Sequence, residues 1–199
     1  MKDHPIGIFD SGVGGLTVAS AVKQILPGES IVYFGDTAHL PYGDKSAESI
    51  RYYSGRITDF LLKHDAKIIL VACNSASASA FDDLRQEYGE RVMLIDVIDP
   101  VVDYLASREF RKVGIIGTKR TISSGTYEQK LKDKAPGMQV VSMATPLLVP
   151  MIEEGFIFDD ISNAIIRTYL SDGSLSGIDA LVLGCTHYPI IRKIGRAHV

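Results

Sequence analysis

The two cysteines of this 199-residue chain, Cys73 and Cys185, are its side chains best suited to chemistry. Each follows a short apolar run, residues 68–72 before Cys73 and residues 181–184 before Cys185. Such runs predict buried strands, and open α/β sheets bind ligands at the C-terminal ends of their strands. Two thiols at corresponding strand ends therefore suggest chemistry done from two faces of one small molecule.

The elements that must position these thiols form an alternating pattern. Short apolar runs alternate with helix-like stretches along most of the chain, which predicts an α/β fold with mainly parallel strands and right-handed crossovers. The expected strands are residues 6–9, 31–34, 68–72, 92–95, 113–117, 140–143 and 181–184.

Several helices are expected between these strands, each with an apolar stripe. Pro27-Gly28 is expected to end the first helix, residues 46–63 read as a strong amphipathic helix, and Asp99 and Asp160 are expected to cap two later ones. The expected stripes are Leu16, Val18, Val22 and Ile25; Ile50, Tyr53, Ile57, Phe60 and Leu61; Phe81, Leu84 and Tyr88; and Ile161, Ile165, Ile166 and Leu170.

The second half of the chain repeats the pattern of the first. Residues 113–117 echo 6–10, and residues 181–184 echo 68–72. We therefore expect two pseudo-symmetric, doubly wound α/β lobes, residues 1–97 and 98–199, facing each other across a cleft.

Composition excludes several classes of protein. The net charge of −3 gives no basic field for nucleic acid or anionic lipid. No apolar run approaches the roughly 20 residues that span a bilayer. The N-terminal residues lack the apolar core of a signal peptide. Two cysteines in a chain without an export signal indicate reduced thiols in the cytoplasm.

Residues 10–15, Asp-Ser-Gly-Val-Gly-Gly, follow the first expected strand and open a helix. Glycines there let backbone amides approach an anion. The spacing does not fit the dinucleotide fingerprint, and no Walker lysine follows. Asp10 suits the ammonium group of a small zwitterion. The alternatives are that the turn is only a tight strand–helix connection and that Asp10 is a helix cap.

Three other segments carry polar groups in loops or at helix starts. Pro41-Tyr42-Gly43 forms a turn whose tyrosine either offers a hydroxyl to a ligand or packs in the loop. Each cysteine begins a segment with hydroxyl and amide side chains at an expected helix N-terminus, which lowers a thiol pKa and attracts carboxylates. The alternative is that both cysteines are small buried apolar residues. These two segments are residues 73–78 (CNSASA) and residues 185–189 (CTHYP).

Together, D-S-G-V-G-G, P-Y-G, C-N-S-A-S-A and G-C-T-H-Y-P resemble the aspartate/glutamate racemase superfamily, and within it the glutamate racemases. The resemblance covers residues 6 to about 191. It implies that Cys73 and Cys185 are the two proton-transfer bases. It implies that Asp10, Glu153 and His187 assist them. The residues expected to hold the substrate are Asp10, Ser11, Pro41, Tyr42, Gly43, Cys73, Asn74, Ser75, Thr186 and His187. Without the resemblance, His187 reads as a capping or packing histidine and Glu153 as a solvent-facing charge.

The resemblance implies conversion of L-glutamate to D-glutamate for peptidoglycan synthesis, with no cofactor or metal and with a homodimer when the protein is full length. Inversion at an α-carbon requires proton removal from one face and delivery to the other, and two thiols can exchange those roles. The alternatives are an aspartate or hydantoin racemase, or an inactive truncated fragment that only binds a ligand or partner.

The chain departs from the family at three places. Ser75 replaces the usual threonine, and Thr145 stands where many members have a third cysteine. Residues 194–199 do not resemble the family segment that returns to complete the first lobe. We therefore expect apolar surface on the first lobe to lack its cover, and a chain extended by that segment to be more stable and more active.

Overall fold

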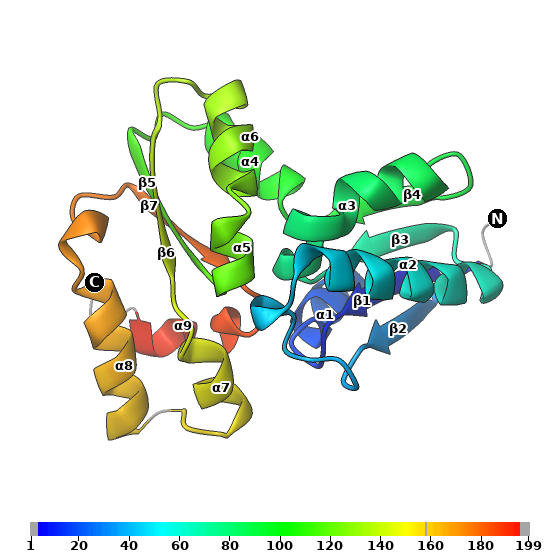
Figure 1. Ribbon diagram of the computed structural model, residues 1–199, viewed down its shortest axis with the longest axis horizontal. Helices are drawn as coiled ribbons and strands as arrows, with labels where there is room; N and C mark the ends of the chain where they lie inside the picture. Colours follow the sequence, from blue (N-terminus) through cyan, green and yellow to red (C-terminus); the bar gives the residue numbers. More distant parts are fainter. Residues whose placement is uncertain (1–3, 158, 196–199) are drawn as a thin grey trace. The chain divides into compact units, whose positions relative to one another are not determined.

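A computed structural model describes residues 4–157 and 159–195 (Figure 1). Residues 196–199, in the C-terminal stretch that departs from the family pattern, lie outside the described residues. Backbone contacts divide the chain into two compact units, Met1–Val101 and Val102–Val199. The division lies within helix α4 (Asp99–Ala106), shortly after the boundary expected between residues 97 and 98.

The first unit contains one four-stranded parallel sheet in the order β2-β1-β3-β4. Its elements are β1 (Ile6–Asp10), α1 (Leu16–Ile25), β2 (Ile31–Gly35), the 3-10 turn η1 (Tyr42–Asp44), α2 (Ala47–Lys63), β3 (Ile68–Val71), α3 (Asn74–Tyr88) and β4 (Met93–Asp96).

The second unit contains a three-stranded parallel sheet in the order β6-β5-β7. Its elements are β5 (Lys112–Gly117), α5 (Lys119–Ser123), α6 (Thr126–Lys134), β6 (Gln139–Ala144), α7 (Leu148–Glu153), α8 (Asp160–Leu170), η2 (Gly173–Leu175), β7 (Ala180–Gly184) and α9 (Tyr188–Gly195). The expected α/β class with parallel sheets is confirmed, and every expected strand is present.

The central strands of both sheets are covered on two faces, as near-continuous apolar sequences require. At the edge of the first sheet, however, Met93 and Ile95 of β4 are exposed, as expected for a first lobe with uncovered apolar surface. In β1, Ile8 packs with Ala19 of α1, whereas the next residue, Phe9, packs with residues of α2 and α3. Successive side chains of a strand point to opposite faces, so α1 covers one face and α2 and α3 the other. In β5, the successive residues Ile115 and Ile116 are both buried, so the central strand of the second sheet is also covered on both faces.

Some helix details differ from the expectations. Leu16 and Ile25 of α1 are exposed, because only the middle of this short helix packs on the sheet, through Ala19 and its neighbours. Phe60 and Ile161 are also partly exposed.

The two expected helix caps were each placed too late in the sequence. Asp159, not Asp160, caps α8, because its side chain accepts the N–H of Ser162 at 2.7 Å. Asp99 lies inside α4, and its N–H donates to Asp96 Oδ1 at 3.0 Å.

The register of the strands brings the candidate residues to one edge within each unit. Asp10 pairs with Gly35 and Phe9 with Val71, so Asp10, Asp36 and Cys73 follow adjacent strands at the same edge. In the second unit Gly117 pairs with both Ala144 and Gly184, so Thr145 and Cys185 occupy corresponding positions. The strand order thus positions each thiol at a C-terminal sheet edge. No helix in the described part of the chain is long and apolar enough to cross a membrane.

Close backbone packing at this edge makes Gly35 intolerant of a side chain. A Cβ atom at Gly35 would lie 2.5 Å from the carbonyl oxygen of Gly12, whereas one at Gly28 would meet nothing within 4 Å. We expect Gly35→Ala to lower the free energy of unfolding by about 1–3 kcal/mol, since a backbone atom must move. The matched control, Gly28→Ala, should change it by less than about 0.5 kcal/mol. Urea denaturation followed by circular dichroism measures both, and equal midpoints would contradict the packing.

Candidate active site

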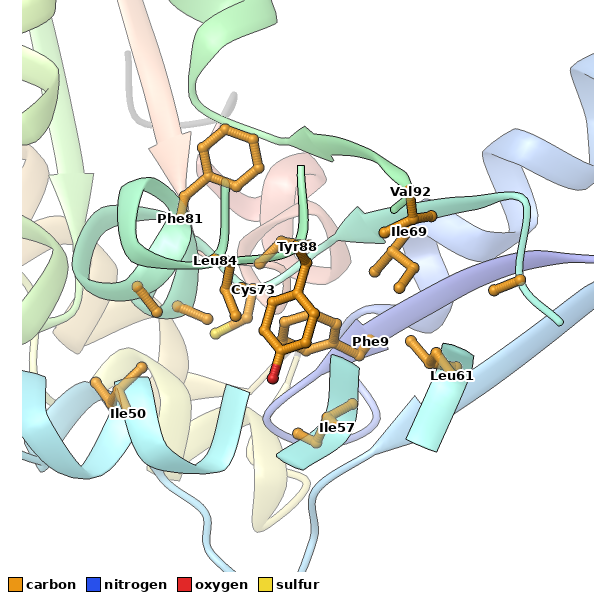
Figure 2. Packing of buried hydrophobic residues seen from close by; sticks show 14 of the residues in the cluster. Phe9, Ile50, Ile57, Leu61, Ile69, Cys73, Phe81, Leu84, Tyr88 and Val92 are labelled. Atoms are coloured by element: carbon orange, nitrogen blue, oxygen red, sulfur yellow. The ribbon is translucent and has the colours of Figure 1, made fainter. Parts of the chain in front are cut away.

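Cys73 lies between β3 and α3, where it is the N-cap residue of the helix. Its side chain is buried, and the thiol donates to the Ser11 hydroxyl at 3.7 Å. Figure 2 shows Cys73 within the apolar cluster that also contains Phe9 and Leu84. Apolar side chains therefore surround one side of the thiol, and its other side faces the turn after β1.

Burial, and after it the negative charge of Asp10, raise the pKa of the Cys73 thiol to about 12. The N–H of Ala76 and the hydroxyl and N–H of Ser11 act in the opposite direction but are weaker. The helix N-terminus thus acts on this pKa in the expected direction, but the net shift for Cys73 is upward. Desolvation and a like charge outweigh the helix amides, so Cys73 is protonated at neutral pH.

The raised pKa predicts slow alkylation of Cys73. Only the thiolate reacts, and its fraction rises about tenfold per pH unit until the pKa is reached. In a Cys185→Ala variant, we expect the rate of iodoacetamide labelling at Cys73 to keep rising from pH 7 to pH 10. A free peptide thiol levels off near its pKa of about 8.5. Mass spectrometry of the labelled peptide measures the rate, and a plateau below pH 9 would contradict the assignment.

Asp10 fixes the turn that faces Cys73. Its side chain is fully buried, and Oδ2 accepts the N–H of Gly12 at 3.0 Å. The Tyr33 hydroxyl donates to the Gly12 carbonyl at 2.7 Å. A Cβ atom at Gly15 would lie 2.5 Å from the Asp10 Cβ, so only glycine allows the turn to close over the carboxylate.

Asn74 and Ser75 form the first turn of α3 and are both buried beside the thiol. Their amide and hydroxyl groups lie at the helix N-terminus, where backbone N–H groups and the helix dipole favour a carboxylate. This placement suits the substrate-holding role that the resemblance implies for them.

The Pro41–Gly43 turn lies between β2 and α2, and its residues Tyr42 and Gly43 begin η1. Pro41 is exposed, Gly43 is half-buried, and the Tyr42 side chain is 1% exposed. The Tyr42 hydroxyl donates to Asp36 Oδ2 at 2.6 Å. This is the geometry of a packed loop tyrosine, one of the two alternatives left open by the sequence. A contact between this turn and substrate stays a prediction.

In the second unit, Cys185, Thr186 and His187 form the buried connection from β7 to α9. Cys185 Sγ lies 3.7 Å from His187 Nδ1. The other ring nitrogen, Nε2, lies 3.2 Å from Glu153 Oε1 at the end of α7. That pair is close enough for an ion pair but lacks hydrogen-bond alignment, and Nε2 is otherwise without a hydrogen bond. A thiol, an imidazole and a carboxylate thus stand in series.

The structure therefore brings the expected residues together in two groups, one in each unit. The first contains Asp10, Ser11, Cys73, Asn74 and Ser75, with the Pro41–Gly43 turn joined to it through Asp36. The second contains Cys185, Thr186, His187 and Glu153. Among residues 4–157 and 159–195, no group of three or more His, Cys, Asp and Glu side chains has a metal-binding arrangement.

The sequence indicates no functional role for three polar residues at these edges: Tyr33, Asp36 and Thr145, the last noted only because it replaces a cysteine. Asp36 and Thr145 each directly follow a strand, and each donates its N–H to the last residue of the neighbouring strand. Each also bonds a buried tyrosine, Asp36 to Tyr42 and Thr145 to Tyr188 at 2.6 Å. A polar residue immediately after an apolar run was the available signal.

A family model described as Asp/Glu/Hydantoin racemase matches residues 16–199. Glutamate racemase of Chlorobaculum parvum is 46% identical over 191 residues, which are 96% of this chain and 70% of that protein. Glutamate racemase of Geobacter metallireducens is 45% identical, covering 95% of this chain and 70% of that protein.

Solved structures give the same result. Glutamate racemase of Francisella tularensis in complex with D-glutamate has a TM-score of 0.92 at 39% identity. It covers 100% of this chain, which spans 74% of it. Glutamate racemase of Thermus thermophilus in complex with beta-chloro-D-alanine has a TM-score of 0.88 at 42% identity, over 99% of this chain and 73% of that one. With the thiols and their neighbours at the edges of two parallel sheets, this chain belongs to the Asp/Glu/hydantoin racemase family, and within it to the glutamate racemases.

Proposed function

We propose that this protein interconverts L- and D-glutamate by proton transfer between two thiols and one substrate molecule. The observation that carries the proposal is the difference between the two cysteines. Cys73 is buried beside Asp10, whose charge favours the protonated thiol. Cys185 instead adjoins His187, whose Nδ1 lies 3.7 Å from its sulfur. An acid and a base are what inversion at a carbon requires.

In the direction from L- to D-glutamate, Cys185 acts as the base. His187 accepts the thiol proton at Nδ1, which requires that Nε2 carry its hydrogen towards Glu153. The carboxylate, 3.2 Å away, stabilises the imidazolium that forms. The Cys185 thiolate then removes the α-proton, and the Cys73 thiol delivers its own proton to the opposite face. Cys73 is left as thiolate, Cys185 as thiol and His187 as imidazolium, and the reverse reaction begins from that state.

Substrate is held by polar groups at the two sheet edges. Asp10 suits the substrate ammonium group, because a carboxylate at a strand end attracts a cation. The N-terminal turn of α3, with Asn74 and Ser75, suits a carboxylate, as do Ser11 and Thr186 beside the thiols. Donors around the α-carboxylate stabilise the charge that develops when the α-proton leaves. The Francisella tularensis relative binds D-glutamate, and this supports the same ligand here.

The reaction we propose uses no cofactor or metal, because the two thiols and the imidazole carry every proton that moves. Glutamate is favoured over aspartate or a hydantoin because the cited relatives at 45–46% identity are glutamate racemases. We propose D-glutamate supply for peptidoglycan synthesis in the cytoplasm as the biological role, and a homodimer as the full-length assembly.

The proposal is tested with the purified chain and each glutamate isomer, followed by circular dichroism. We expect the signal from either isomer to decay to zero, since racemisation ends at equal amounts of both. Dialysis against EDTA should leave the rate unchanged, and the protein should show no pyridoxal absorbance. A chain that inverts neither isomer, or that needs a metal to regain activity after dialysis, contradicts the proposal. Aspartate and hydantoin substrates, run in parallel, test the alternative racemases.

A further inference from the structure

Asp36 is a nearly buried carboxylate that the proposed proton transfers do not use. It is the first residue after β2 and is 6% exposed. One oxygen accepts the Tyr42 hydroxyl at 2.6 Å, and the other lies 2.7 Å from His39 Nδ1. Its N–H donates to the Asp10 carbonyl at 3.0 Å. Asp36 thus joins the end of β1, where Asp10 lies, to the Pro41–Gly43 turn.

The Tyr42 side chain connects this carboxylate to the surroundings of Cys73. Tyr42 belongs to the same buried cluster as Cys73, with Ile50 and Ile57 of α2. Burial and the bond to Asp36 raise the pKa of its hydroxyl far above the ordinary value. The hydroxyl hydrogen is committed to Asp36, so the side chain serves as a strut between Asp36 and the backbone of the turn.

Stability alone does not account for a carboxylate at this position. Taking a charge out of water is costly, and apolar replacements of buried ionic groups are often neutral or stabilising. A charged acceptor does make a shorter and stronger hydrogen bond than a neutral one. Such a bond is suited to holding one loop conformation, which is what a preformed binding site needs.

We propose that Asp36 is a positioning residue, which acts through the Tyr42 hydroxyl to hold the Pro41–Gly43 turn in its substrate-binding conformation. The inference rests on the proposed function, because it assumes that this turn contacts glutamate. Asp36 itself touches neither substrate nor the reacting thiols. Its loss should therefore weaken substrate binding while proton transfer in the bound complex continues.

Steady-state kinetics of four variants and one control variant test this role. We expect Asp36→Ala and Tyr42→Phe each to raise the KM for glutamate about tenfold, the equivalent of one hydrogen bond to a charged group. The kcat should stay within about threefold of wild type, as expected when binding alone is lost. The double variant should be no worse than Asp36→Ala. Asp36→Asn should recover most of the affinity, because its amide oxygen can still accept the tyrosine hydrogen. Tyr52→Phe, an exposed tyrosine on α2, is the matched control.

Amide hydrogen exchange tests the anchoring without using activity. The N–H of Lys45 donates to the Tyr42 carbonyl at 3.2 Å. We expect its exchange to accelerate about tenfold in both Asp36→Ala and Tyr42→Phe, and not in Tyr52→Phe. Unchanged exchange in Tyr42→Phe overturns the inference, and so does faster exchange with an unchanged KM. A wild-type chain that does not racemise glutamate instead refutes the proposed function, whatever the exchange result.

Discussion

Cys73→Ala and Cys185→Ala are each expected to reduce racemisation below detection, a loss of more than about 1,000-fold. Each face of the α-carbon has one base in the proposed mechanism, so either alanine removes one of the two transfers that inversion needs. Each variant should still exchange the α-proton with solvent, without inversion, on the face of the α-carbon where a thiol remains. In D₂O, Cys73→Ala should still exchange the α-proton of L-glutamate, and Cys185→Ala that of D-glutamate. Proton NMR of each isomer measures the exchange.

The control for both thiol variants is Ser77→Ala. Ser77 is buried in α3, one turn after Cys73, and its hydroxyl donates to the Val71 carbonyl at 3.1 Å. The substitution Ser77→Ala removes a polar atom of similar size from α3, and racemisation should persist. If either thiol variant still inverts glutamate at a substantial rate, the two-base assignment fails.

His187→Ala is expected to lower kcat/KM about 100-fold, because the imidazole accepts the proton of Cys185. The loss must be equal in both directions, since the two isomers have equal free energies. Measuring α-proton exchange in variants that keep only one thiol shows on which face of the α-carbon His187 acts. In a Cys73→Ala background, His187→Ala should slow α-proton exchange of L-glutamate by a similar factor, about 100-fold. In a Cys185→Ala background it should leave exchange of D-glutamate unchanged.

Two further variants test whether Glu153 acts through His187 on Cys185. Glu153→Gln removes the charge opposite His187 Nε2 and should give a smaller loss than His187→Ala. His64→Ala, an exposed histidine after α2, should have no effect. Equal losses of exchange on both sides of the α-carbon would argue that His187 supports the fold rather than Cys185.

The strands could be predicted because each is a short apolar run bounded by polar residues. The order β2-β1-β3-β4 could not, since it depends on how the crossovers pack. Short helices such as α5 and α7 also escaped prediction, because five or six residues carry too little periodicity. The cap of α8 differs from the expected one by a single residue, because Asp159 and Asp160 are adjacent and both suit the role.

At the candidate site, the type and position of each residue could be predicted from the sequence. The balance between competing energies could not. The sequence indicates a helix start after Cys73 but does not reveal how deeply the thiol is buried beside Asp10, and burial decides its pKa. Glu153 reads as a solvent-facing charge until its contact with His187 is seen. Likewise, nothing local predicts that Tyr42 turns back onto Asp36.

The central claim is tested most directly by proton NMR of L-glutamate incubated with the wild-type chain in D₂O. A proton leaves through one thiol and a deuteron arrives from the other, so the account predicts that D-glutamate carries deuterium at its α-carbon from the first turnovers. Unconverted L-glutamate should remain protiated at that stage. D-glutamate that retains the original proton would show that one base moves the proton across the α-carbon, and this result would contradict the two-thiol account.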